Sequence, residues 1–591
     1  MIKGGEFLVK DQEAKNIFIP EDFSEDQLMM ASATKEFVEK ELDPHRGQFE
    51  KKDYKLTEDC MKKAGELGLL GISVPAEYGG MGMPFNTSVL ICDKISGANG
   101  SFSTAFGAHT GIGTLPILLY GNESQRQKYL PKLASGKWMG CYCLTEPGAG
   151  SDANSGKTKA VLTEDGKHYL ITGQKMWISN AGFADVFIVF ARIEDDKNIT
   201  GFILEKGMEG ITLGEEEHKL GLNSSSTRQV FFNEVKVPTE SMLGGRGNGF
   251  KIAMNALNVG RIKLSAAVLD ACRRVIGLSI NYSNERIQFG IPIAKFGAIR
   301  HKLADMAIRT YAIESATYRA GNDIEKNIEK LESEGVDHQQ AHLKGVEEYA
   351  IECSIVKVLG SETIQFCSDE GIQIYGGMGY SADAPMEAAY RDARIARIYE
   401  GTNEINRMLL VGMILKRAMK GELDIMSPAM KVASELMSIP SFDSPDENVL
   451  FAVEKEHLKK LKKAILMTAG KAAQHYAMEI EKEQEVLMNL ANMVIEVYTA
   501  ESAILRSEKL AAKNGEETVE HQINMSKLFL YSAIKNCQRC GEEVILSFAE
   551  GDEQRMLLMG LKRFTKGYNI NTKQLRRSIA VKLIEENKYC F

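Results

Sequence analysis

One glutamate stands where an apolar run gives way to a new helix, a setting that suits a general base. In the stretch RIARIYEGTNEINRMLL (394–410), Glu400 follows apolar residues such as Ile398 and is followed at once by Gly401. Thr402 is placed to cap the helix that comes next. The positive end of that helix lowers the pKa of a nearby carboxyl, whereas burial among apolar neighbours raises it. A base that removes a weakly acidic C–H proton needs burial to dominate; the alternative is a structural glutamate beside a helix cap.

Two further stretches carry side chains that suit a planar ligand. CYCLTEPGAGSDANS (141–155) sets Thr145 and Ser151 around a glycine-rich turn, where hydroxyls and backbone N–H groups can hydrogen-bond a ring carbonyl or nitrogen. KMWISN (175–180) contains Trp177, one of two tryptophans in the chain. An ordinary turn and a core tryptophan are the alternatives. A planar cofactor would use the hydroxyls at its edge and the indole as a shield.

The composition describes a multidomain globular protein. The chain has 591 residues, 44% of them hydrophobic and 26% charged, which is too long for one ordinary core. Its formal net charge of −8 argues against a nucleic-acid partner, and no apolar run reaches the length of a membrane span. The N-terminus lacks the features of a secretory signal or a transit peptide. The ten cysteines form neither a disulfide scaffold nor a complete metal site, so we expect a cytoplasmic protein without a bound metal.

The residue pattern along the chain changes four times, between helix-like, strand-like and linker-like segments. We expect an N-terminal helical domain, a β-barrel domain, a helical bundle that carries Glu400, a linker and a C-terminal helical domain. Their predicted bounds are 1–141, 142–245, 246–422, 423–449 and 450–591. This order is not the strand–helix alternation of a doubly wound sheet. The predicted fold class is therefore mainly α with a central β domain.

Local signals mark particular elements within this order. Ser24 with Gln27 forms a capping-box pattern at a helix start, and Asp165-Gly166 favours a hairpin turn between two strands. The segment 426–440 is amphipathic and rich in methionine. We interpret it first as a packed helix between domains, with peripheral contact to a membrane as the alternative.

Five motifs, in order and spacing, resemble the acyl-CoA dehydrogenase family over about residues 25–420. They are CLTEPGAGSD, KMWISNAG, ERIQFG, QIYGGMGY and YEGTNEI. GAHTGIGTLPILLYG, ALNVGR and the additional C-terminal block resemble the very-long-chain branch of that family. The resemblance implies the fold of helical domain, β-barrel and helical bundle, extended here by a C-terminal helical domain.

The resemblance also implies a reaction and its partners. The expected activity is FAD-dependent dehydrogenation of a long-chain fatty acyl-CoA to the trans-2-enoyl-CoA in β-oxidation, with electrons passed to electron-transfer flavoprotein. An acyl-CoA oxidase and a non-enzymatic assembly factor of the same fold are the alternatives. Family members share each FAD site between subunits. Because the C-terminal block would cover the surface that shorter relatives use to form tetramers, we expect a homodimer.

Site residues are carried over position by position. Glu400 matches the catalytic base, and its N–H is expected to polarise the thioester carbonyl. The residues expected along the flavin are Tyr142, Cys143, Leu144, Thr145, Ser151, Trp177, Ile178 and Ser179. A second set is expected to hold the pyrophosphate and adenosine of the FAD from the neighbouring subunit: Arg286, Phe289, Gln373, Gly376 and Gly377. Thr402 and Glu404 are expected to close the FAD site. The residues expected at the substrate are Ser151, Asn258, Arg261, Tyr399 and Gly401.

Glycines raise two further questions. Isovaleryl-type relatives carry their base directly before the arginine that matches Arg261, and here that residue is Gly260. Gly107, Gly111 and Gly113 match helical positions beside the fatty tail, where small residues either leave a deep channel or allow close helix packing.

Overall fold

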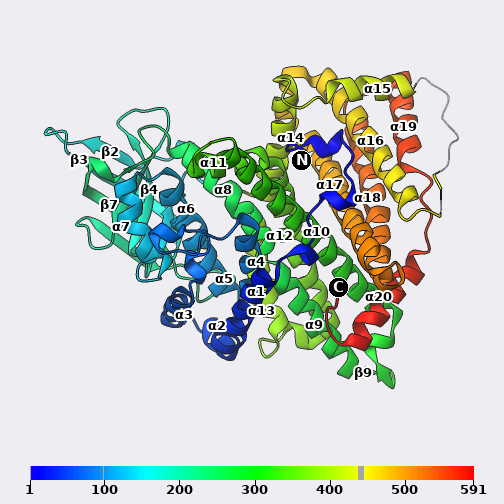
Figure 1. Ribbon diagram of the computed structural model, residues 1–591, viewed down its shortest axis with the longest axis horizontal. Helices are drawn as coiled ribbons and strands as arrows, with labels where there is room; N and C mark the ends of the chain where they lie inside the picture. Colours follow the sequence, from blue (N-terminus) through cyan, green and yellow to red (C-terminus); the bar gives the residue numbers. More distant parts are fainter. Residues whose placement is uncertain (1, 98, 437–444, 447) are drawn as a thin grey trace.

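The structure is a computed structural model that describes residues 2–97, 99–436, 445–446 and 448–591. Figure 1 shows a central body of helices between a β domain and a second group of long helices. The predicted linker falls partly on residues 437–444 and 447, which lie outside the described residues.

The N-terminal domain is helical, as its apolar periodicity predicts. The Gln27 N–H donates to the Ser24 hydroxyl at 3.3 Å, and the Ser24 N–H donates to the Gln27 side chain at 2.9 Å. The predicted capping box is therefore confirmed. The helices are α1 (Glu25–Phe37), α2 (Arg46–Glu50), α3 (Tyr54–Glu66), α4 (Phe85–Ser96), α5 (Gly100–Gly107), α6 (Leu115–Tyr120) and α7 (Glu123–Ala134).

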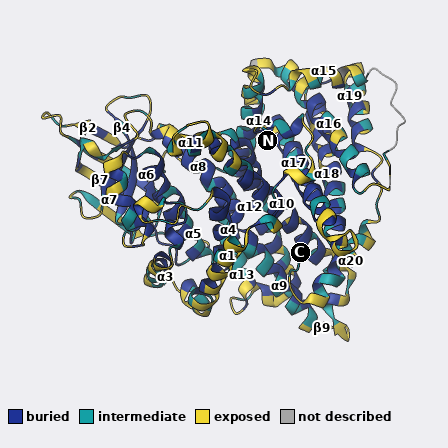
Figure 2. Cartoon of the chain, in the orientation of Figure 1, coloured by how far each residue is buried: buried dark blue, intermediate teal, exposed yellow. Residues whose placement is uncertain are grey.

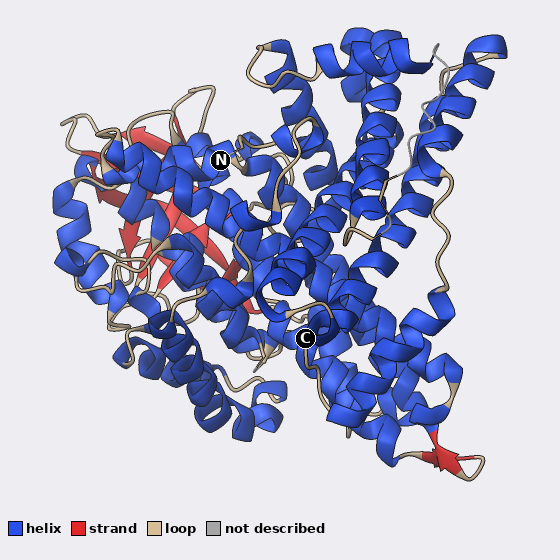
Figure 3. Ribbon diagram, turned by 45° about the vertical axis from the view of Figure 1, so that its right-hand side comes forward, coloured by secondary structure: helices blue, strands red, loops and turns tan. Residues whose placement is uncertain are grey.

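The middle domain is a sheet of eight strands in the order β6-β7-β3-β2-β4-β5-β8, with β1 beside β4. The strands are β1 (Gly140–Cys143), β2 (Lys159–Leu162), β3 (His168–Ser179), β4 (Val186–Ile193), β5 (Thr200–Glu205), β6 (Ile211–Glu216), β7 (Thr227–Pro238) and β8 (Met242–Leu243). Asp165 and Gly166 connect the antiparallel strands β2 and β3, as predicted. The end strands β6 and β8 do not pair with each other, so the expected barrel is not closed by hydrogen bonds. Figure 3 shows these strands gathered in one part of the molecule.

The helical bundle follows the sheet and surrounds α12. Buried residues occupy most of α12, which packs against α8, α9 and α14 (Figure 2). The elements are α8 (Gly249–Ala266), α9 (Leu269–Glu285), β9 (Ile287–Gln288), β10 (Ile291–Pro292), α10 (Gly297–Ser333), α11 (His338–Glu348), α12 (Ala350–Tyr375), α13 (Pro385–Arg394) and α14 (Asn403–Met419). The predicted class, mainly α with a central β domain, is confirmed.

The C-terminal domain adds a second layer of helices to the bundle. Its helices are α15 (Met426–Leu436), α16 (Ala452–Tyr476), α17 (Gln484–Asn514), α18 (Glu520–Leu546), α19 (Gly551–Thr565) and α20 (Thr572–Glu586). Helix α10 packs against α17, α18 and α20, so the long helix α10 belongs to both layers. Among the described helices, none combines the length and the apolar character needed to cross a membrane.

Helix α15 covers much of the methionine-rich segment identified in the sequence. It packs against α16, where Val432 is buried and Glu435 pairs with Lys463 at 2.8 Å. Met426 and Met430 remain exposed. This arrangement supports the packed-helix interpretation for the described part of the segment, whereas contact with a membrane stays a prediction.

Buried charges join the C-terminal domain to the bundle. Glu501 on α17 accepts from Arg319 of α10 at 2.8 Å and from Lys462 of α16 at 2.7 Å, and all three side chains are buried. The N-terminal segment enters the same seam: the ring of Phe7 packs on that of Tyr498 with centroids 4.8 Å apart. Because a buried charge without its partner is costly, these groups depend on one another.

We expect Glu501→Gln to destabilise the protein by about 3–5 kcal/mol, because it leaves two buried cations without their common carboxylate. The measurement is the shift of the chemical denaturation curve. Glu334→Gln is the matched control, since Glu334 pairs with Lys330 at 3.8 Å on the exposed surface and should cost less than about 1 kcal/mol. Equal shifts for the two variants would show that the buried network is not needed for stability.

Candidate active site

The loop that carries Glu400 has an unusual backbone. Glu400 and Gly401 adopt positive φ angles of 57° and 79° in succession, a conformation that glycine tolerates and other residues rarely adopt. The Thr402 hydroxyl then accepts from the Ile405 N–H at 3.2 Å, so the predicted cap of α14 is confirmed. Glu404, in the first turn of α14, is exposed.

This backbone conformation accompanies close packing of the Glu400 carboxylate on α8. A Cβ atom added to Gly260 would lie 2.5 Å from Glu400 Oε2, far inside van der Waals contact. The missing side chain at residue 260 therefore provides the space that the carboxylate occupies. The two positions at which relatives carry the base thus adjoin each other in this chain.

The carboxylate is held in a setting that favours its neutral form. Glu400 Oε2 is buried without a hydrogen-bond partner among the described residues, and burial raises the pKa of Glu400 to about 7. Arg261 and Lys357 oppose this shift by Coulomb attraction. Burial dominates, as a general base requires.

The source of this burial differs from our sequence-based expectation. We expected neighbours in the chain such as Ile398 to cover the carboxylate, but Ile398 is 48% exposed and Tyr399 is 36% exposed. The carboxylate packs against Gly260 of α8. Tertiary packing on α8 therefore contributes to the burial that raises the pKa of Glu400.

Lys357 and Arg261 form hydrogen bonds with oxygens of the loop and of α8, and neither forms a hydrogen bond with the Glu400 carboxylate. Lys357 donates to the Gly401 carbonyl at 2.7 Å and to Asn403 Oδ1 at 2.9 Å. Arg261 donates to Asn258 Oδ1 at 2.7 Å and lies 3.4 Å from the Glu400 carbonyl. Asn258 and Arg261 are buried and are not part of the adjacent cavity wall, so their predicted contact with substrate stays a prediction.

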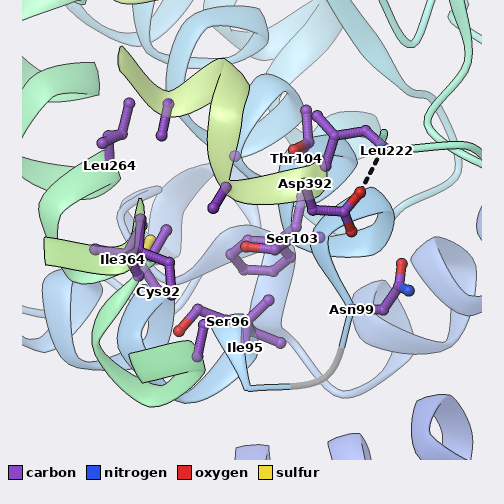
Figure 4. Close-up of a pocket in the computed structure, with 18 of the residues that line it drawn as sticks. Cys92, Ile95, Ser96, Asn99, Ser103, Thr104, Leu222, Leu264, Ile364 and Asp392 are labelled. Carbon is purple, nitrogen blue, oxygen red and sulfur yellow. Dashed lines mark hydrogen bonds between the residues drawn. The ribbon is translucent and has the colours of Figure 1, made fainter. Parts of the chain in front are cut away.

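Glu400 lies in the wall of a cavity of about 280 Å³. The cavity extends along one face of α8 and α9, where Gly260, Leu264, Ala267 and Ala271 line it. Figure 4 shows part of the wall, with Leu264 and Ile364 on one side and Thr104, Leu222 and Asp392 on the other. Mostly apolar and small side chains surround this space, which suits an alkyl chain.

Two of the three glycines singled out in the sequence belong to this wall. Gly107 and Gly111 line the cavity, and a Cβ atom at either would meet nothing within 4 Å. Gly113 instead packs on Gly140, where an added Cβ would lie 2.9 Å from the carbonyl carbon. The first two glycines therefore leave open volume, and the third allows close packing.

The loop 145–151 is fixed by a buried ion pair that the sequence analysis missed. Glu146 pairs with Lys175 at 2.7 Å and also accepts from the Lys157 N–H at 2.6 Å. The Met176 N–H donates to the Thr145 carbonyl at 2.9 Å. These bonds bring the loop that contains Ser151 beside the end of β3 and the Trp177 segment. The sequence did contain a signal for this ion pair, because Glu146 lies within the motif CLTEPGAGSD and Lys175 within the motif KMWISNAG.

The Trp177 segment has the features of a cofactor surface. Trp177 is 52% exposed and has a φ of 61°, at an irregularity where the pairing of β3 with β7 shifts. It is therefore not a core tryptophan. Ile178 is buried, and Ser179 lines the cavity that contains Glu400. An exposed indole fits the face of a planar group. Tyr142, Cys143 and Leu144, also expected along the flavin, are buried.

The remaining predicted cofactor residues lie at another end of the molecule. Arg286 adjoins the β9–β10 hairpin, where Phe289 is 94% exposed. The rings of Tyr282 and Tyr375 stack with centroids 4.0 Å apart and join the ends of α9 and α12. Gln373, Gly376 and Gly377 lie at this end of α12 and are exposed. In Figure 1 the hairpin is at the lower right, away from the β domain at the left.

Comparison with known proteins decides the family. Over 587 residues the chain is 44% identical to a probable acyl-CoA dehydrogenase of Bacillus subtilis, covering 99% of this chain and 98% of the relative. The chain belongs to the acyl-CoA dehydrogenase family. The crystal structure of an acyl-CoA dehydrogenase complexed with FAD from Bacillus anthracis superposes with a TM-score of 0.96 at 43% identity, with both chains fully covered.

Family models cover each part of this acyl-CoA dehydrogenase family member. The N-terminal domain model matches residues 24–137, the middle domain model 141–235, and two models described as C-terminal domains match 247–415 and 460–563. The very long-chain specific acyl-CoA dehydrogenase of Rattus norvegicus is 39% identical over 364 residues, 60% of this chain and 53% of that relative. The resemblance stated from the motifs is thus confirmed, with the very-long-chain likeness confined to part of the chain.

We expect Glu400→Gln to stabilise the protein above pH 7. The folded pKa of Glu400, about 7, exceeds its ordinary value of 4.5, so ionisation costs stability that accumulates as pH rises between these values. At about 1.4 kcal/mol per pKa unit, the cost has an upper bound of about 3 kcal/mol. The measurement is the difference in thermal midpoint between variant and wild type across this pH range.

The exposed Glu404 provides the matched control for this measurement. A hydrogen bond from its own backbone N–H lowers the pKa of Glu404, so Glu404→Gln should give no stabilisation above pH 7. If Glu400→Gln were no more stable than wild type above pH 7, the carboxylate would not be in the strained setting described.

Proposed function

We propose that this chain is an FAD-dependent acyl-CoA dehydrogenase that forms the trans-2-enoyl-CoA from a saturated, long-chain fatty acyl-CoA in β-oxidation. The observation that carries the proposal is a carboxylate with a pKa near 7 in the wall of an apolar cavity. A base with this pKa is about half ionised at neutral pH and is strong enough to accept a proton from carbon.

The residues of the chain provide the proton-transfer half of the reaction. Glu400 removes the α-proton of the acyl thioester, and the activity rises with pH through about 7 as the carboxyl ionises. The Glu400 N–H has no hydrogen-bond acceptor among the described residues, so it is available to the thioester carbonyl. FAD, when bound, supplies the hydride acceptor for the β-carbon. In this proposal Trp177 would cover the flavin and Ser179 would orient it.

The cavity supports the long-chain preference. Gly107 and Gly111 leave volume that larger side chains would fill. The part of the wall formed by α8, α9 and α13 continues well past Glu400, to Leu278 and Pro385. An extended acyl chain would bury its methylene groups there, each worth about 0.8 kcal/mol.

Electron-transfer flavoprotein is the proposed electron acceptor. The two alternative functions, an acyl-CoA oxidase and an assembly factor, predict different observations. An acyl-CoA oxidase would form peroxide from oxygen without an added acceptor. An assembly factor that lacks flavin chemistry would purify colourless. The raised pKa of Glu400 favours an enzyme, because it coincides with a carboxylate oxygen that is unpaired among the described residues and with a place in the cavity wall.

We expect Glu400→Gln to retain FAD and bind acyl-CoA but to reduce its flavin at least about 10²-fold more slowly, because glutamine keeps the shape and loses the basic oxygen. Rapid anaerobic mixing with a saturated acyl-CoA measures the rate of flavin bleaching. Adding Gly260→Glu to Glu400→Gly should restore part of the activity, since the two positions adjoin each other. Wild-type bleaching by Glu400→Gln would exclude Glu400 as the base.

The separation of the predicted FAD residues supports a shared site in a homodimer. Strand β3, which contains Trp177, and strand β9, which follows Arg286, lie at different ends of one chain (Figure 1). The hairpin end also exposes large apolar side chains: Ile287, Phe289, Ile291, Met378 and Tyr380. A second copy would cover these side chains and bring its Arg286 toward the flavin site of the first. Helix α20 packs on α9 and α10, which removes part of the bundle surface from further assembly.

We expect Arg286→Ala to lower FAD retention, because a guanidinium is lost from the pyrophosphate of the neighbouring subunit. The measurement is the FAD content per chain after gel filtration, with light scattering to give the oligomeric state. Arg555→Ala, at an exposed residue of α19, is the control and should keep its FAD. A monomer with full FAD content would contradict the shared site.

A further inference from the structure

Lys263 places an ammonium group in the wall of the acyl cavity. The residue is only 7% exposed, and it lines both the main cavity and a smaller space beside it. No described residue forms a hydrogen bond or an ion pair with its side chain. A buried charge without a partner is costly, so the group calls for a ligand that the protein itself does not supply.

The carboxylates in the same wall are engaged elsewhere. Glu50 accepts from Arg391 at 2.9 Å, and Asp392 accepts from the Leu222 N–H at 2.6 Å, the bond drawn in Figure 4. Glu400 is influenced by Arg261 and Lys357 and not by Lys263. The acids that line the described cavity therefore leave the Lys263 ammonium uncompensated.

The other cations of the wall differ from Lys263 in this respect. Arg46 and Arg274 both pair with Asp43, at 3.5 and 2.8 Å. Among the described lining residues, Lys263 is the cation without a carboxylate partner. Lys263 interacts electrostatically with the buried thiol of Cys92, whose pKa burial raises, so this thiol provides no counter-charge at neutral pH.

The smaller space beside Lys263 does not provide a counter-charge for its ammonium group. Its volume is about 10 Å³, room for about one water molecule. The Thr110 and Thr114 hydroxyls at its wall donate to the carbonyls of Phe106 and His109, each at 2.8 Å. One water there would solvate the ammonium but would not neutralise it.

The position of Lys263 relative to the base indicates where an anion would lie. Lys263 follows Gly260 by three residues on α8, about 4.5 Å along the helix axis. Leu264, Ala267 and Ala271 continue the same wall beyond it. An acyl chain that follows this wall from Glu400 toward Ala271 would therefore pass Lys263 about one helical turn beyond its reacting carbons.

We propose that the cavity accepts acyl-CoAs whose acyl chain ends in a carboxylate, and that Lys263 pairs with this ω-carboxylate. The inference rests on the proposed acyl-CoA dehydrogenase function and specifies its substrate class. The reaction at the thioester end is unchanged: Cα loses a proton and Cβ loses a hydride, and the ω-carboxylate remains intact. Only chains that place the carboxylate at the depth of Lys263 gain from the pair, so the preference depends on chain length.

The test compares ω-carboxyacyl-CoAs with the unsubstituted acyl-CoAs of the same length, using the holoenzyme. The readout is the ratio of kcat/KM for the two substrates at each length. Wild type should show a length at which this ratio peaks, and Lys263→Met should lower the peak at least tenfold, equivalent to about 1.4 kcal/mol. The same variant should use the unsubstituted chain more efficiently, because methionine removes a buried charge from the path of the methylene groups.

Two further variants separate charge pairing from a structural role. Lys263→Arg keeps the charge and should keep a peak in the ratio, and Lys251→Met, on the exposed start of the same helix, should match wild type. A wild-type ratio without a peak, or the same ratio in Lys263→Met as in wild type, would overturn the inference and leave Lys263 as a water-solvated lysine. Flavin reduction by neither substrate series would instead overturn the proposed function, and the inference with it.

Discussion

The contact between the Glu400 carboxylate and Gly260 is the constraint on which the site depends. A Cβ atom at residue 260 would lie 2.5 Å from Oε2, so the Glu400 carboxylate can take this position because α8 has a glycine at this point. The left-handed backbone at Glu400 and Gly401 lies in a sparsely populated region that surrounding structure must stabilise. The conformation of the Glu400 loop therefore depends on the glycine of helix α8 against which it packs.

The charges around the base follow from the same constraint. Arg261 and Lys357 direct their hydrogen bonds to carbonyl and amide oxygens of the loop and of α8, and none reaches the Glu400 carboxylate. A direct ion pair would hold the pKa of Glu400 low and make it a weak base. At their actual positions the two cations fix the backbone and limit the effect of burial, which leaves the pKa near neutrality.

The scaffold keeps this region rigid through polar contacts in its interior. The Glu146–Lys175 pair ties the 145–151 loop to β3, and the Arg319–Glu501 pair ties the bundle to the C-terminal domain. Such pairs contribute less to net stability than apolar packing, but they tolerate few alternative arrangements. The first pair fixes the loop that contains Ser151 within the β domain, and the second fixes the C-terminal helices on the bundle.

The sequence alone determined much of the local structure and the family, and it singled out Glu400 as the candidate base. The caps at Ser24 and Thr402, the turn at Asp165 and the order of the domains depend on neighbouring residues in the chain, and periodicity and turn chemistry report on such neighbours. The motifs around Thr145, Trp177 and Glu400 carried the resemblance that the comparisons confirmed. The sequence also showed that residue 260 is a glycine, but it did not show that the Glu400 carboxylate packs against this glycine.

Tertiary structure alone decided how these residues behave. The Glu400 carboxylate packs on a helix about 140 residues earlier in the chain, whereas the sequence suggested cover by Ile398, which is exposed. The same holds for Lys263, whose helical periodicity gives no sign that it faces a cavity without a counter-ion, and for the pairing of Glu146 with Lys175. The physical reason is that burial and ionisation depend on every atom within a few ångströms, and most of those atoms belong to residues remote in sequence.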